Sequence, residues 1–99
     1  MAHTPETVLG IVKARLNRLA SDNSLDTYLT QRIEAADQEL AASGIRLEAD
    51  RMEDQVFLSD IVVWQHQNRD KPSGMPEWLR LRRRERFLQQ RKRDEEAGP

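Results

Sequence analysis

The chain of 99 residues contains no cysteine, so it forms no disulfide and has no thiol chemistry. It has only two histidines, His3 and His66, and neither has a second ligand at metal-binding spacing, so we expect no metal site. No apolar run approaches the roughly 20 residues of a membrane span, and the N-terminus lacks a signal pattern. These absences favour a protein without membrane attachment.

Features of enzymes are also missing. The sequence has no glycine-rich phosphate loop and no serine nucleophile motif, and its carboxylates are interspersed with basic residues on expected helix faces. A catalytic carboxylate pair needs a pocket that separates the two pKa values, and nothing in so short a chain indicates one. We therefore expect neither catalysis nor a cofactor.

The composition is lean for a monomer, with 37% hydrophobic and 33% charged residues. One small domain fits this length, and oligomerisation is a common way to stabilise it. The net charge of -1 hides an asymmetry, because residues 1–67 carry 6 basic and 11 acidic side chains whereas residues 68–99 carry 10 and 6. Opposite charges can pair within one subunit or between neighbouring subunits.

Hydrophobic periodicity predicts an all-α fold, a small bundle of about four helices with a projecting, arginine-rich C-terminal helix. The domain is expected to span residues 1–94. The predicted helices cover residues 5–20, 25–43, 51–67 and 76–93, and residues 95–99 are predicted to be a disordered tail. The predicted core residues are Leu29, Ile33, Leu40, Phe57, Ile61 and Trp64.

Local signals set these boundaries. Pro5 and Pro76 suit the first position of a helix, and Gly44 suits a left-handed C-cap. Asp50 followed by Glu53 predicts a capping box at the start of the third helix.

The loop around residues 70–76 and the helix after it form the most unusual segment. Trp78 either closes the core or anchors an interface, where tryptophan is enriched. The arginines admit three interpretations: ion pairs with the acidic helices, nucleic-acid binding, or contact with an acidic protein. A sequence pI of about 6.1 weighs against a dedicated DNA-binding protein.

The order of several short segments resembles the small head-tail connector, or head-completion, proteins of tailed phages and prophages. The segments are Leu25-Asp26-Thr27-Tyr28-Leu29, Ile33-Glu34-Ala35-Ala36, Gly44-Ile45-Arg46-Leu47, residues 60–71 and residues 74–86. The resemblance covers about residues 6–90. The arginine-rich helix and its acidic end depart from the family pattern, and C-termini vary within this family.

The resemblance implies a structural virion protein that assembles in the host cytoplasm and resides in the neck of the virion. It implies a ring of about twelve subunits under the portal, which joins the capsid to the tail and extends the DNA channel. The expected partners are the portal protein, other neck or tail proteins and further copies of the chain. DNA passes through such a ring without specific binding.

Under this interpretation the C-terminal helix contacts a neighbouring subunit or the portal. The expected interface residues are Trp78, Leu79, Arg80, Arg82, Arg83, Arg84, Arg86 and Phe87. Two alternatives stay open: a small nucleic-acid-binding accessory protein that acts through the basic helix, and a helical adaptor outside any virion.

Overall fold

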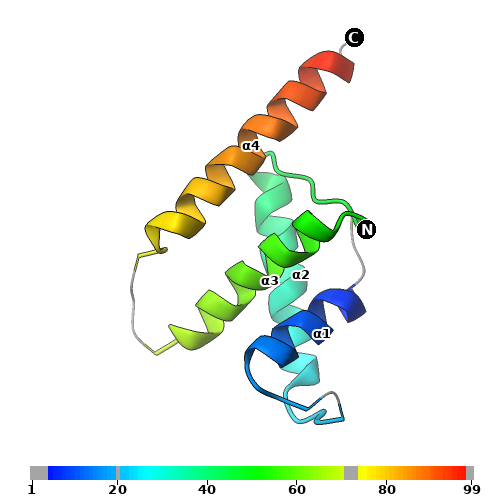
Figure 1. The fold of residues 1–99 in the computed structure, drawn as a ribbon, viewed down its shortest axis with the longest axis vertical. Coiled ribbons are helices and arrows are strands. Elements are labelled where there is room, and N and C mark those ends of the chain that lie inside the picture. The colour runs from blue at the N-terminus through cyan, green and yellow to red at the C-terminus, as the bar shows by residue number, and fades with distance from the viewer. Residues whose placement is uncertain (1–4, 20, 71–73, 98–99) are drawn as a thin grey trace.

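The computed structural model describes residues 5–19, 21–70 and 74–97, and within them the chain is all-helical. The four helices are α1 (Pro5–Arg15), α2 (Asp26–Ala42), α3 (Met52–Gln67) and α4 (Glu77–Ala97). α1, α2 and α3 pack against one another, whereas α4 packs on α3 alone among the helices. Figure 1 shows α4 lying across the end of this three-helix body, with its C-terminal half extending beyond it.

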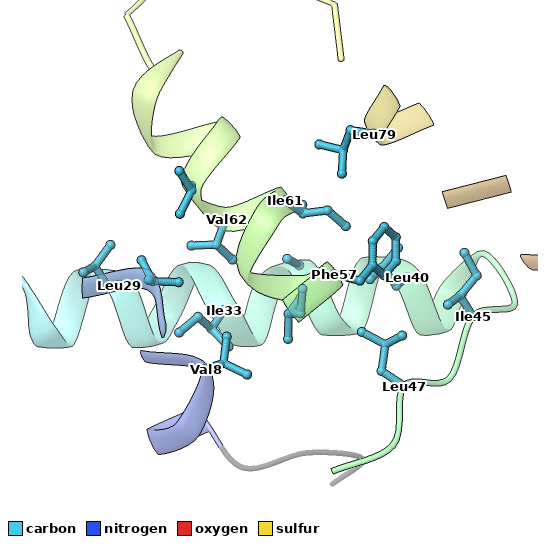
Figure 2. Packing of buried hydrophobic residues seen from close by; sticks show 14 residues of the cluster. Val8, Leu29, Ile33, Leu40, Ile45, Leu47, Phe57, Ile61, Val62 and Leu79 are labelled. Carbon is cyan, nitrogen blue, oxygen red and sulfur yellow. The ribbon is translucent and has the colours of Figure 1, made fainter. Parts of the chain in front are cut away.

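One core joins all four helices and the segment that connects α2 to α3. Val8 and Val12 of α1 are buried, as are Leu29, Ile33 and Leu40 of α2. The connecting segment adds two buried residues, Ile45 and Leu47, and α3 contributes the largest set: Phe57, Leu58, Ile61, Val62 and Val63. In Figure 2 Leu79 of α4 points toward α3 near Ile61, so the start of α4 belongs to the core.

α1 ends at Arg15 rather than at residue 20, so the predicted boundary was wrong; residue 20 itself lies outside the described residues. Asn17 has a φ of 60°, and its N–H donates to the carbonyl of Ala14 at 3.1 Å. The N–H of Arg18 donates to the carbonyl of Lys13 at 2.8 Å. This pattern is a Schellman motif, which asparagine can close because it tolerates the left-handed conformation.

α2 ends in the same motif at the expected glycine. Gly44 has a φ of 96°, and the N–H of Ile45 donates to the carbonyl of Leu40 at 2.8 Å. A side chain at position 44 would be strained by this φ, and its Cβ would lie 3.3 Å from the ring of Phe87 in α4. Gly44 therefore terminates α2 and allows the close approach of α4.

α3 begins without the predicted capping box. Its N-cap is Arg51, with no side-chain cap hydrogen bond, and Glu53 forms an ion pair with Arg51 at 3.0 Å. The Asp54 carboxylate instead accepts a hydrogen bond from the backbone N–H of Glu48 at 2.9 Å. The acidic residues at this helix start thus fix the preceding segment rather than cap the helix.

α4 is longer than predicted. It begins at Glu77, with the carbonyl of Pro76 accepting the N–H of Arg80 at 3.0 Å, and it continues to Ala97. The predicted disordered tail was therefore wrong for residues 95–97, which remain helical, while residues 98 and 99 lie outside the described residues. Near its end, Asp94 pairs with Arg46 at 2.6 Å, and Arg93 pairs with Glu48 at 3.3 Å.

Candidate docking surface on the C-terminal helix

The arginines of α4 divide between two faces of the helix. One face turns toward the body and buries Leu79, Arg86 and Gln90. The opposite face exposes Leu81 and Leu88, with 53% and 51% of each residue accessible, and Trp78, 49% accessible, lies at the edge of this face. The helical repeat of 3.6 residues separates the two faces. Leu81 and Leu88 are seven residues apart, about two turns, and therefore lie on one stripe of the helix.

The inward face centres on a buried ion pair between Arg86 and Asp54 of α3. The Arg86 Nε donates to Asp54 Oδ1 at 2.8 Å, and its Nη2 donates to Asp54 Oδ2 at 3.1 Å. The same Nη2 donates to the carbonyl of Arg46 at 2.9 Å, and Nη1 donates to Gln90 Oε1 at 3.3 Å. Arginine's planar fork suits this two-point contact, so Arg86 joins α4 to α3 and to the α2–α3 segment.

A second carboxylate, Asp60, connects three helices. It is buried on α3 and pairs with Arg82 of α4 at 3.3 Å and with Arg15 at the end of α1. Arg82 and Arg86 therefore match two acidic positions of α3, Asp60 and Asp54. The interpretation that arginines of the last helix pair with acidic residues of the body holds for this face.

The environment of Asp54 stabilises its charged form. Burial raises the pKa of the Asp54 carboxyl, but hydrogen bonds from Arg86 and from the Glu48 amide, together with the charges of Arg86 and Arg51, outweigh this effect. The pKa of Asp54 consequently lies below its usual value. The bound carboxylate is favoured in the folded state over the unfolded state.

We predict that this pair makes the fold sensitive to acid. The pKa of Asp54 is lower in the folded than in the unfolded protein, so the ion pair stabilises the fold fully above the unfolded pKa of about 3.9. This stabilisation is lost as the pH falls through the pKa of Asp54 in the folded protein. Urea unfolding at a series of pH values should show the free energy of unfolding declining below about pH 4. In Asp54→Asn the protein should be less stable at neutral pH and its decline with acid shallower. Equal slopes for the two proteins would contradict the assignment.

The outward face carries cations that no described carboxylate neutralises. Arg80, Arg84 and Lys92 form no ion pair with residues that the structure describes. Arg91 has only an exposed partner, Glu95, at 3.9 Å. Exposed apolar side chains between unpaired arginines are typical of a surface that meets a partner.

An open groove runs beside this face, between the end of α2 and the first half of α4. Its volume is about 540 Å³, and its lining residues are Ser43, Glu77, Arg80, Leu81, Arg83, Arg84 and Phe87. Arg83 donates to Ser43 Oγ at 3.0 Å and so joins the two walls. Three arginines, one glutamate and two apolar side chains suit an occupant with negative charge.

The expected interface residues do not form one surface. Trp78, Arg80 and Arg84 are exposed, and Arg83 lies on the groove. Leu79 and Arg86 are buried within the subunit, Arg82 faces Asp60, and the half-buried Phe87 packs on the core beside Gly44. In this fold Leu79 and Arg86 hold α4 to its own body, and the role of the set as an interface stays a prediction.

Two exposed leucines were missed from the sequence, Leu81 and Leu88. Their spacing of seven residues, out of phase with Leu79 and Arg86, was the available signal. Among the expected core residues, Trp64 is only half buried at the edge of the cluster, whereas the other five are buried: Leu29, Ile33, Leu40, Phe57 and Ile61.

His66 takes a structural position. Its ring lies 5.7 Å from that of Tyr28, measured between centroids, and burial together with the charges of Arg69 and Arg18 lowers its pKa. No group of three potential metal-ligating side chains occurs in the described part of the chain, and His3 lies outside it. The residues of the predicted loop at 71–73 are likewise outside.

Comparison of the chain with known protein families, curated proteins and solved structures finds no match. Among the described helices, none is both long and apolar enough to cross a membrane.

Proposed function

We propose that this protein is a structural subunit without catalytic activity, a head-tail connector that assembles under a phage portal and joins the capsid to the tail. The outward face of α4 carries the proposal: Leu81 and Leu88, with Trp78 at the edge of the face, are exposed near cations that form no ion pair with a described residue, Arg80, Arg84 and Lys92. The resemblance of residues 6–90 to connector proteins supports a portal or neck protein as the partner. In the neck of a virion these side chains would contact the portal protein or a neighbouring connector subunit.

The chemistry of this face suits an assembly contact. Aromatic residues and arginine are enriched in the centres of protein interfaces, and a few of them carry most of the binding energy. The face lies on a continuous helix that Leu79 and Arg86 fix to the body. A fixed helix presents its anchors at little cost in conformational entropy.

The portal ring encoded in the same genome provides the test. We expect the purified chain to bind that ring in sedimentation experiments, and we expect the double variant Trp78→Ala/Leu88→Ser to bind at least about tenfold more weakly. Both side chains are exposed, so the variant should fold normally by circular dichroism.

Leu19→Ser and Met52→Ser are matched controls, because these residues are even more exposed, at 75% and 73%, but lie outside α4. They should bind the ring like the natural chain. Failure of the natural chain to bind portal rings would refute the connector proposal, and equal losses from the controls would refute the role of α4.

Nucleic-acid binding is the second candidate, and three cations without an ion pair among the described residues, Arg80, Arg84 and Lys92, favour it. A protein that neutralises several phosphates loses affinity steeply as salt rises. A salt titration on arbitrary duplex DNA separates the two functions. Tight binding by the monomer, with a salt slope that Arg80→Gln/Arg84→Gln reduces by about two, would favour nucleic acid over the portal.

A further inference from the structure

We propose that the acidic tip of α4, which carries Glu95 and Glu96, docks into the arginine-lined groove of a second copy. Subunits would then associate head to tail. This inference rests on the self-association that the proposed function requires, and it names the two surfaces that meet.

The groove is a basic site with free cations. Its lining includes Arg80, Arg83 and Arg84 against one carboxylate, Glu77. Arg83 is engaged by Ser43, whereas Arg80 and Arg84 form no ion pair with any described residue.

The tip of α4 has the opposite character. Asp94, Glu95 and Glu96 occupy the last turn, where the helix dipole already places partial negative charge and where no basic residue occurs. Asp94 is bound by Arg46, but Glu95 has only its distant exposed contact with Arg91, and Glu96 forms no ion pair with a described residue. Carboxylates at this end are unfavourable in the isolated subunit, and arginines from another molecule would relieve that cost.

The tip cannot reach the groove of its own chain. α4 is one continuous helix from Glu77 to Ala97, and a helix rises about 1.5 Å per residue. Arg84 and Glu95 are therefore separated by about 16 Å along the axis, and Arg80 and Glu96 by about 24 Å. Only a second copy can bring the two charges together.

The contact joins two different surfaces, so it is heterologous. Each subunit keeps one free groove and one free tip, and repetition closes into a ring where the rotation allows it and otherwise continues as a filament. The tip extends beyond the body in Figure 1, so the three-helix body does not block its approach to another molecule.

A charge exchange tests the contact. One variant carries Glu95→Arg/Glu96→Arg, which gives a basic tip and leaves the groove basic. The other carries Arg80→Glu/Arg84→Glu, which gives an acidic groove and leaves the tip acidic. All four positions are exposed, so both variants should fold like the natural chain by circular dichroism.

We expect the natural chain to self-associate, in sedimentation up to millimolar concentration or on portal rings as a template. Each variant alone should associate at least about tenfold more weakly, because like charges then face each other. An equimolar mixture should recover association, since every tip then finds a groove of opposite charge.

Three outcomes would overturn the inference: a natural chain that stays monomeric under both conditions, single variants that associate normally, or a mixture that does not recover. Loss of portal binding by the groove variant with unchanged self-association would also overturn it and would assign the groove to the portal. If self-association follows the expected pattern but portal rings are not bound, the connector proposal fails while the head-to-tail contact stands.

Discussion

Replacing Arg86 by methionine is expected to lower the free energy of unfolding by about 3–5 kcal/mol. The substitution keeps a long apolar stem but removes the guanidinium that neutralises Asp54, which is 1% exposed. It also removes the donors to the Arg46 carbonyl and to Gln90. Breaking a buried pair from one side costs more than the pair contributes, because the Asp54 carboxylate then stays buried with only the Glu48 N–H and the charge of Arg51 to stabilise it. Urea unfolding followed by far-UV circular dichroism measures the loss.

Arg84→Met is the matched control, because Arg84 is exposed on the same helix and forms no ion pair with described residues. Its effect should be within about 0.5 kcal/mol. Adding Asp54→Asn to Arg86→Met should recover part of the loss, since the amide is neutral and keeps an oxygen for the N–H of Glu48. An Arg86→Met protein as stable as Arg84→Met would show that the pair does not hold α4.

The remaining ion pairs of α4 contribute less. Arg82, Arg93 and Asp94 form pairs that are substantially exposed on the α4 side. Such pairs are typically worth 0–1 kcal/mol each and weaken with salt. The first half of α4 is therefore anchored by Leu79 and Arg86, whereas its C-terminal turns are held mainly by exposed charges.

Hydrophobic periodicity was sufficient to predict four helices and the apolar stripe of α2. Leu29, Ile33, Ala36 and Leu40 recur at three- or four-residue intervals, and this spacing places them on one buried face. Gly44 marked the end of α2 because glycine adopts positive φ without strain. Asn17 ended α1 by the same geometry, but an asparagine in an apolar-periodic stretch is a weaker signal than a glycine.

The division of the arginines could not be predicted from sequence. Arg82, Arg84 and Arg86 alternate along the chain, yet only Arg82 and Arg86 meet carboxylates, because α3 and the 45–48 segment lie on one side of α4. That placement depends on how the helices pack in the tertiary structure and not on the local sequence. Leu79 was assigned to an interface for the same reason, since a narrow apolar strip fits an external partner and an internal core equally well.

Shortening Leu79 to alanine is expected to lower the free energy of unfolding by about 2–5 kcal/mol, a large part of the roughly 5–15 kcal/mol typical of a chain this size. Leu79 is the only fully buried apolar residue of the described α4. The substitution therefore leaves a cavity where α4 meets α3. Urea unfolding measures the change, and Leu81→Ala is the control because Leu81 is half exposed two residues away. A loss for Leu79→Ala no greater than for Leu81→Ala would mean that α4 is a free arm rather than part of the body. In that case the face that it presents would not be fixed.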